Sequence, residues 1–281
     1  MRFGVQIFLT DRSIRPDVVA REAEARGFEL LFIPEHTHIP LSRKTPPPMG
    51  EPLPEQYYRC LDPFLALTAA AAATERLRVG TAVCLVAQRD PIVTAKEIAT
   101  LDLLSGGRFI FGVGFGWNRD ELEHHGVAYD ERRAVTRERV LAMQRLWEDE
   151  AASFQGEHVS FEPSNAWPKP IQKPWPPVFM GGSGGPKLFS AVAEYADGWM
   201  PIGGRGMAKA MPELRRRFEE NGRDPDTLKI MPIGSIPDPG KLEYFAGLGI
   251  EDVVLGVDHG TEAEVLPTLD RFAEIVAPFR G

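Results

Sequence analysis

The chain has 281 residues, of which 43% are hydrophobic, so it can bury a large core within one domain. Its formal net charge is −8 and no basic stripe appears, which disfavours nucleic acid as a partner. Apolar runs stay below the roughly 18 residues of a membrane span. Met1–Phe8 already reads as a strand rather than a signal peptide, and two cysteines do not suggest a disulfide framework, so we expect a cytoplasmic protein with no membrane partner.

Strand and helix signals alternate along the whole chain. The first helix has Pro16 in its first turn and Gly27 past its end, and Asp62-Pro63 and Asp90-Pro91 each combine an N-cap with a proline at the first helical position. The expected strands are Arg2–Phe8, Phe28–Ile33, Leu77–Val83, Phe109–Val113, Val178–Met180, Gly198–Ile202, Leu228–Ile233 and Asp252–Gly256. The expected helices are Arg15–Arg26, one from Asp62, Asp90–Leu104, Arg132–Glu148, Pro186–Tyr195, Met207–Asn221, Gly240–Leu248 and Glu262–Phe279.

Eight short apolar strands that alternate with helices predict an α/β fold, a single (β/α)8 TIM barrel, which typically needs about 250 residues. We expect one domain over residues 1–281 with insertions at about 34–62 and 118–177, the second including the Trp- and Pro-rich stretch Phe154–Pro177. A doubly wound open sheet is the competing architecture. It is disfavoured because the first strand is not followed by G-x-G-x-x-G spacing, and because no acidic residue sits where such a motif needs one.

Two strand ends are rich in glycine. Phe109–Val113 runs into Gly114-Phe115-Gly116-Trp117, and Val178–Met180 runs into Gly181-Gly182-Ser183-Gly184-Gly185, which opens a helix. Glycines at a strand end let the backbone approach a ligand closely, and the exposed N–H groups of a helix start attract phosphate. Because active sites of TIM barrels lie at the carboxyl ends of the strands, we expect both turns to border one pocket.

Pro34–Pro40 follows the second strand and holds the candidates for proton chemistry. His36 titrates near neutrality and can give or take a proton, and Glu35 beside it can orient the ring or accept a proton itself. The alternative is that His36 only caps a loop. His38 is a candidate for contact with a ligand, and the proline-rich connection 37–61 is either a lid or a stiff surface loop.

Trp117 and Asn118 follow the first glycine turn. Trp117 can stack on a ligand, line a substrate wall or simply pack in the core, and Asn118 can serve as the N-cap of the next helix. Small residues after the third strand, from Gly80 to Ala82, leave room for a planar ligand.

A metal-dependent hydrolase is an alternative reading of Glu35-His36-Thr37-His38. Such a site needs further ligands from other strand ends, but strands four to seven end in Gly114, Gly182, Ile202 and Gly234. Only Asp258-His259 after the eighth strand offers ligands. We therefore expect no metal site.

The chain resembles the bacterial luciferase-like monooxygenase superfamily and, within it, the deazaflavin (coenzyme F420)-dependent oxidoreductases. The resemblance covers nearly the whole chain. It is carried by Pro34–Pro40, Arg76–Thr81, Arg89–Pro91 with Lys96, Leu101–Phe109, Gly112–Trp117 and Ala196–Trp199.

The resemblance implies a barrel with insertions, usually a homodimer, and a coenzyme ring at the carboxyl mouth. Thr81, Ala82 and Val83, with a non-proline cis peptide at Ala82-Val83, would support that ring from behind. The residues Gly114, Phe115 and Gly116 would also border the coenzyme, whose phosphate would reach Gly181, Gly182, Ser183 and Gly184.

Two positions depart from the pattern of relatives. Relatives more often carry Asp-His where this chain has Glu35-His36, and sugar-phosphate-oxidising relatives carry a glutamate where this chain has Trp117. We therefore expect His36, helped by Glu35, to carry the proton while F420 exchanges a hydride with a small organic substrate that contacts His38 and Trp117. An FMN-dependent monooxygenase that uses oxygen is the nearest alternative, and a binding or sensing protein without turnover is a third.

Overall fold

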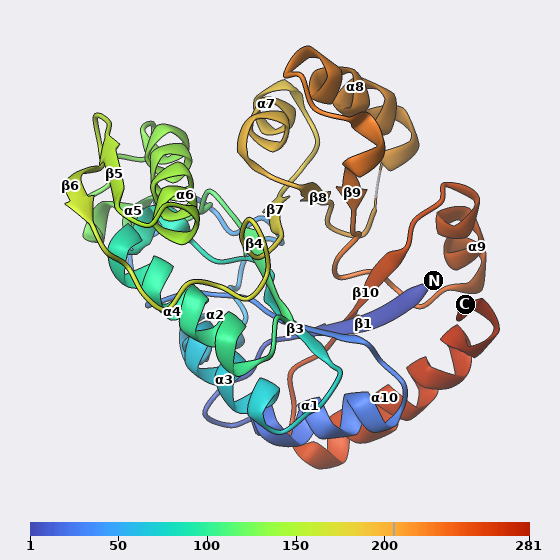
Figure 1. Ribbon diagram of the computed structural model, residues 1–281. Helices are drawn as coiled ribbons and strands as arrows, with labels where there is room; N and C mark the ends of the chain where they lie inside the picture. Colours follow the sequence, from blue (N-terminus) through green and yellow to red (C-terminus); the bar gives the residue numbers. More distant parts are fainter. Residues whose placement is uncertain (205) are drawn as a thin grey trace.

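The computed structural model describes residues 1–204 and 206–281. Eight parallel strands stand in the order β10-β1-β2-β3-β4-β7-β8-β9 and curve into a nearly closed barrel (Figure 1). The barrel predicted from the sequence is therefore confirmed, and the open doubly wound sheet is not found. The strands are β1 (Arg2–Ile7), β2 (Leu30–Ile33), β3 (Arg78–Thr81), β4 (Phe109–Val113), β7 (Val178–Gly181), β8 (Gly198–Met200), β9 (Lys229–Ile230) and β10 (Asp252–Val257).

The seam between β9 and β10 closes through the segment that follows β9. The amide of Val254 donates to the carbonyl of Pro232 at 2.9 Å, and the amide of Ser235 donates to the carbonyl of Val254 at 3.0 Å. The expected strand Leu228–Ile233 is regular only over Lys229–Ile230, so β9 is shorter than predicted. The residues that follow β9 still pair with both neighbouring segments, since Ile233 forms a bridge with Ile202 after β8 and Pro232 and Ser235 bond Val254 of β10.

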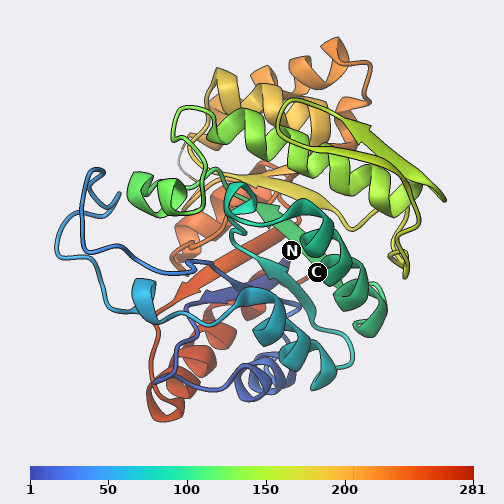
Figure 2. The same cartoon turned by 90° about the vertical axis from the view of Figure 1, so that its left-hand side faces the viewer.

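Helices cover the outside of the barrel, as the turned view shows (Figure 2). Asp62 and Asp90 are the predicted N-caps: the Asp62 carboxylate accepts from the Leu65 amide, and the Asp90 carboxylate accepts from the amides of Ile92 and Val93. The helices are α1 (Pro16–Ala25), α2 (Gln56–Arg59), α3 (Pro63–Ala72), α4 (Pro91–Leu104), α5 (Arg119–His124), α6 (Arg132–Glu148), α7 (Pro186–Tyr195), α8 (Met207–Glu220), α9 (Pro239–Gly247) and α10 (Glu262–Val276). Short 3-10 helices are η1 (Val86–Gln88), η2 (Pro225–Thr227) and η3 (Ala277–Phe279). No helix of the described ranges is long and apolar enough to cross a membrane.

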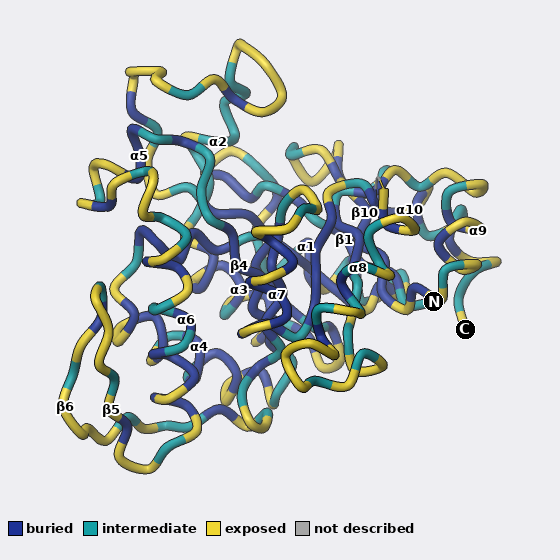
Figure 3. Tube along the Cα trace, turned by 90° about the horizontal axis from the view of Figure 1, so that it is seen from above, coloured by how far each residue is buried: buried dark blue, intermediate teal, exposed yellow. Residues whose placement is uncertain are grey.

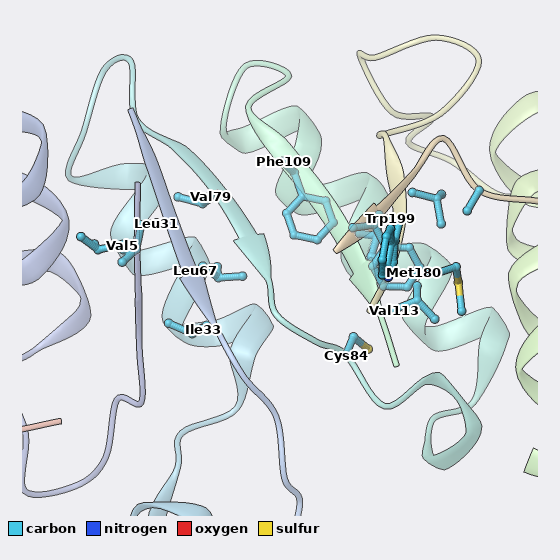
Figure 4. Packing of buried hydrophobic residues seen from close by; sticks show 14 of the residues in the cluster. Val5, Leu31, Ile33, Leu67, Val79, Cys84, Phe109, Val113, Met180 and Trp199 are labelled. Carbon is cyan, nitrogen blue, oxygen red and sulfur yellow. The ribbon is translucent and has the colours of Figure 1, made fainter. Parts of the chain in front are cut away.

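The core has two layers because alternate residues of a strand face opposite sides of the sheet. Residues such as Val5, Leu31 and Val79 pack outward against the helices (Figure 4). A smaller cluster fills the barrel interior, and it contains Leu30, Phe32, Ala82, Ile110, Phe179, Met200, Met231, Ile233 and Val254. Seen from above, the buried trace marks the barrel, and exposed trace concentrates in the peripheral loops (Figure 3).

The two insertions contain elements that were not predicted. The 34–62 connection carries the one-turn helix α2, and the segment after Trp117 forms α5, of which the sequence indicated only the N-cap, Asn118. The stretch Phe154–Pro177, expected to lie outside the regular pattern, contributes to an antiparallel pair, β5 (Ala152–Gln155) and β6 (Ser160–Ser164). Most side chains of β6 are exposed, so this pair lacks the apolar alternation that reveals a strand in a sequence.

Candidate active site

His36 lies just past β2, at the carboxyl mouth of the barrel, and its ring is almost enclosed. Nδ1 of His36 is 2.8 Å from Oε2 of Glu121, which belongs to α5. The second oxygen of Glu121 accepts the backbone N–H of Thr37 at 3.2 Å. The side chain of His36 is 6% exposed and that of Glu121 is 0% exposed. One buried carboxylate therefore holds both the ring and the chain that follows it.

Two aromatic rings flank His36. Nε1 of Trp117 donates to Nε2 of His36 at 3.4 Å, and the two ring planes meet at 71°. Tyr57 of α2 lies 5.4 Å from the imidazole between centroids, and its ring packs against Phe8 in a tilted arrangement with centroids 4.7 Å apart. Burial raises the pKa of the Tyr57 hydroxyl. The 34–62 insertion thus supplies a wall of the site through Tyr57.

Cys60 contacts the backbone of the segment that carries His36. Its thiol donates to the backbone carbonyl of His36 at 3.2 Å, and burial raises the pKa of the thiol to about 11. A thiol in this environment is a structural donor rather than a nucleophile.

Glu35 has a different task from the one expected. Its carboxylate accepts from the amide of Leu85 at 2.6 Å and from Nε of Arg89 at 2.5 Å. The Arg89 guanidinium also pairs with Asp62 and Glu97. The expectation that Glu35 orients the imidazole is therefore corrected: Glu121 contacts the ring, and Glu35 fastens the segment between β3 and α4, because its position after β2 brings it beside that segment.

The segment after β3 has the predicted non-proline cis peptide at Ala82-Val83. The Val83 side chain lies between two strand ends: a Cβ on Gly114 would sit 2.2 Å from one of its methyl groups, and a Cβ on Gly181 would sit 2.4 Å from the other. The carbonyl of Ala82 accepts from Nε2 of Gln6 at 3.1 Å. Gly114 and Gly181 therefore lack side chains because the Val83 side chain occupies the space that a Cβ would need.

Thr81, Phe115 and Gly116 were also expected around the coenzyme ring, and they differ in burial and in contacts. Thr81 is fully buried, and its hydroxyl donates to the carbonyl of Gly112 at 2.7 Å, so that hydroxyl is occupied. Phe115 is partly buried beneath the guanidinium of Arg133, 4.2 Å from its ring centroid. Gly116 has φ of +78°, a conformation that favours glycine, and it turns the chain into α5.

Asn118 begins that helix as the expected N-cap, accepting from the amide of Glu121 at 3.5 Å. The turn at Gly116 and the helix start at Asn118 therefore bring Trp117 to Nε2 of His36 and Glu121 to Nδ1 of the same ring. Glu121 and Tyr57 were both missed by sequence reasoning. The only signal for Glu121 was its place three residues after an N-cap, which marks a helix start but no ligand.

A second region lies at the glycine loop 181–185. Nε1 of Trp199 donates to the carbonyl of Gly182 at 2.9 Å, so Trp199 faces the core and anchors the loop. Ser183 and Gly184 are exposed, as a phosphate-binding loop requires. Within the described chain, neither α7 nor α8 has a side-chain cap at its N-terminus.

A cavity of about 360 Å³ lies where these two helices begin. It is lined by Gly184, Gly185, Gly206 and Lys209, among others. Uncapped N–H groups and positive helix ends favour an anion, and Lys209 adds charge. Glu213 also lines the cavity, but its carboxylate pairs with Arg216 and Arg217, so the residues fit a phosphate group.

A larger cavity of about 570 Å³ opens at the mouth next to the aromatic pair. Phe8, Gln6 and Gln56 line it together with Gly234 and Gly256 from the last two strands. His36 does not line this cavity; Phe8, which does, contacts Tyr57, and Tyr57 in turn contacts the imidazole.

His38, expected to contact substrate, is exposed and turns toward α5. Its Nε2 is 2.9 Å from Nδ1 of His124, and the hydroxyl of Thr37 bonds both His38 and Nε2 of His125, the latter at 2.7 Å. Among residues 1–204 and 206–281 no group of three or more His, Cys, Asp or Glu side chains is arranged to hold a metal ion.

Comparison with known proteins agrees with this architecture. A protein of Mycobacterium tuberculosis (strain H37Rv), described as uncharacterized, is 42% identical over 281 residues, with 99% of each chain covered. A phthiodiolone/phenolphthiodiolone dimycocerosates ketoreductase of Mycobacterium bovis (strain BCG) is 29% identical over 241 residues, which are 80% of this chain and 62% of the relative.

Among solved structures, a monooxygenase from Streptomyces bottropensis matches with a TM-score of 0.79 at 22% identity, covering 99% of both chains. An F420-dependent secondary alcohol dehydrogenase, in complex with an F420-acetone adduct, matches with a TM-score of 0.77 at 19% identity over the whole of both chains. These two likenesses concern the fold. The family model described as luciferase-like monooxygenase matches residues 18–236, and the chain belongs to that family.

Proposed function

We propose that the protein is an oxidoreductase that transfers a hydride between coenzyme F420 and a small alcohol or carbonyl substrate, with His36 as the proton carrier. The observation that carries the proposal is His36 itself, held at the barrel mouth between Glu121 and Trp117. Interconversion of a ketone and an alcohol moves one hydride and one proton, so the site needs such a group. The relative described as a ketoreductase supports a carbonyl as the reacting group.

The coenzyme would be held at two places. The loop 181–185 and the starts of α7 and α8 would bind its phosphate, and the segment with Val83 would lie behind its ring. Bound there, F420 would supply or accept the hydride. These residues bind and orient, whereas the proton is handled by the imidazole.

His36 would act through Nε2, the ring atom that does not contact Glu121, with the substrate oxygen taking the place of the Trp117 N–H as its partner. In alcohol oxidation Nε2 takes the hydroxyl proton, and in carbonyl reduction it returns a proton to the alkoxide oxygen. The rings of Trp117 and Tyr57 flank the imidazole, and the exclusion of water from it would strengthen the hydrogen bond between imidazole and substrate.

FMN with oxygen is the alternative. FMN and F420 both carry a phosphate beyond a ribityl chain, so one glycine loop can serve either. F420 is preferred because a dedicated proton carrier suits hydride exchange with a carbonyl group, and a deazaflavin reacts poorly with oxygen.

A homodimer is part of the proposal. Helix α3 is apolar on all sides, which is typical of a helix with partners all round, yet Leu65 on it is 75% exposed. The neighbouring α4 exposes further apolar side chains. The exposed large apolar side chains of α3, of α4 and of the segment 165–172 are Leu65, Ile92, Val93, Leu103, Leu104, Trp167 and Ile171. A second copy of the chain would cover them.

Titration of the protein with F420 and with FMN, followed by coenzyme fluorescence, tests the cofactor. We expect saturable binding of F420 and, with a panel of small secondary alcohols, loss of the oxidised F420 absorbance. Binding of FMN alone, with oxygen consumption on reduction, would overturn the proposal in favour of a monooxygenase.

The role of His36 is tested by His36→Ala. Turnover should fall on the order of 10²-fold or more, while the Kd for F420 stays unchanged. His158→Ala, in the β5–β6 insertion, is the matched control and should leave both unchanged. Unaltered turnover in His36→Ala would remove the imidazole from the mechanism.

A further inference from the structure

We propose that Glu121 is a positioning residue that fixes His36 in one tautomer, with its proton on Nδ1 and the accepting lone pair on Nε2. The expected effect on turnover rests on the proposed function, in which His36 carries the proton. The geometry that supports the tautomer involves no coenzyme.

Two contacts with different chemistry require the same tautomer. An ionised carboxylate only accepts hydrogen bonds, so Nδ1, at 2.8 Å from Oε2 of Glu121, must donate. An indole N–H only donates, so Nε2, at 3.4 Å from Nε1 of Trp117, must accept. The neutral imidazole has one donor and one acceptor nitrogen, and these two neighbours assign which is which.

The burial of Glu121 makes the assignment strict. Its side chain is fully buried, and a buried carboxylate is costly unless hydrogen bonds satisfy it. In the described chain the backbone N–H of Thr37 donates to one of its oxygens and Nδ1 of His36 contacts the other. If the ring carried its proton on Nε2, Glu121 would lose a donor and Trp117 would point its N–H at another N–H.

Glu121 is itself held in place from both sides of the site. Asn118 caps the helix that carries it, and the backbone N–H of Lys44 donates to the neighbouring Asp120 at 2.9 Å. Helix α5 therefore lies against the segment that follows β2, and Glu121 lies between the two. Titratable groups beside this arrangement include Tyr57, whose ring flanks the imidazole, Cys60, whose thiol donates to the His36 carbonyl, and His125, which bonds the Thr37 hydroxyl.

Nitrogen-15 NMR of histidine-labelled protein reads the tautomer without any coenzyme. At a pH where the ring is neutral, the wild-type His36 signals should be those of the Nδ1–H form. A wild-type spectrum of the Nε2–H form would overturn the proposal at once, even if no variant folded.

Glu121→Gln tests the positioning role. Glutamine offers one acceptor oxygen for two donors, Thr37 N–H and His36 Nδ1–H, so the pure Nδ1–H signature should be lost. Turnover should fall on the order of 10²-fold, with KM and the Kd for F420 unchanged. Glu121→Asp keeps both acceptor oxygens and should recover part of the turnover and of the signature.

Glu123→Gln is the matched control, because Glu123 lies on the same helix and pairs with Lys44 without contacting the imidazole. It should keep the Nδ1–H signature. Persistence of the signature in Glu121→Gln would show that Glu121 has no positioning role. Failure of F420 to bind would instead refute the proposed function and leave the tautomer result standing.

Discussion

Nε2 of His38 lies 2.9 Å from Nδ1 of His124, and the two rings stack with 18° between their planes. This contact joins the 34–62 insertion to α5, beside the bond between the Thr37 hydroxyl and Nε2 of His125. We call Thr37, His38, His124 and His125 the histidine latch. An N–H···N bond needs one nitrogen without a proton, so full protonation of both His38 and His124 would break it.

We expect the histidine latch to loosen in acid. The pKa of His125 is lowered from 6.5 by burial and by the neighbouring His38. A histidine whose folded pKa is lowered binds fewer protons folded than unfolded, so its stabilising contribution is present above about pH 6.5 and declines below it. Hydrogen exchange of the Thr37 and Lys44 amides, corrected for intrinsic rate, should accelerate as pH falls through this window.

The triple variant His38→Gln/His124→Gln/His125→Gln, which removes all three imidazoles, is the control for the latch. It should exchange at one corrected rate above and below that pH. Equal protection of the wild-type amides on both sides would show that the latch does not respond to protons. The groups that also face it are Lys44, Asp120, Glu121, Glu123 and Arg139.

Replacement of Glu35 by Gln should destabilise the protein rather than act on the chemistry alone. Glu35 is buried against Arg89 and the Leu85 amide, and removing one partner of a buried ion pair costs about 3–5 kcal/mol. Urea unfolding measures the loss. Glu97→Gln removes a more exposed partner of the same Arg89 and should cost about 0–1 kcal/mol. Equal losses in the two variants would contradict a special role for Glu35.

Gly114→Ala should displace Val83. The new Cβ would lie 2.2 Å from a Val83 methyl group, and overpacking of this kind costs about 1–3 kcal/mol. F420 affinity should fall as well, because Val83 would lie behind the ring. Adding Val83→Ala removes the clashing methyl groups and should restore much of the stability. Gly247→Ala, where a Cβ meets no atom within 4 Å, is the control. A double variant no better than Gly114→Ala would reject this account.

Much of the fold could be predicted because its signals are local. Alternation of apolar strands and helices gave the barrel, and Asp62 and Asp90 with the prolines after them gave two helix starts. The short α2 and the exposed β6 have no such period, since tertiary contacts rather than an amphipathic pattern hold them.

The site was only partly predictable for a related reason. His36 stood out by its residue type at a strand end, but its partner Glu121 lies 85 residues away on a helix too short to be recognised. Glu35 was misassigned because adjacency to His36 in sequence suggested contact, whereas its partner is Arg89, 54 residues away. Neighbouring residues after a strand point in different directions, so sequence adjacency alone does not predict which of them meet.

The apolar face over α3 and α4 gives the last prediction. Leu65 and Val93 are 75% and 56% exposed on adjacent helices, and water contact with this much apolar surface is relieved when a second copy covers it. Leu65→Glu/Val93→Glu would place charges in that interface, so light scattering should report a dimer for the wild type and a monomer for the variant. Tyr244→Glu introduces a charge at an exposed position on α9 and should leave the dimer intact. A monomeric wild type at micromolar concentration would contradict the assignment of this face to a dimer interface.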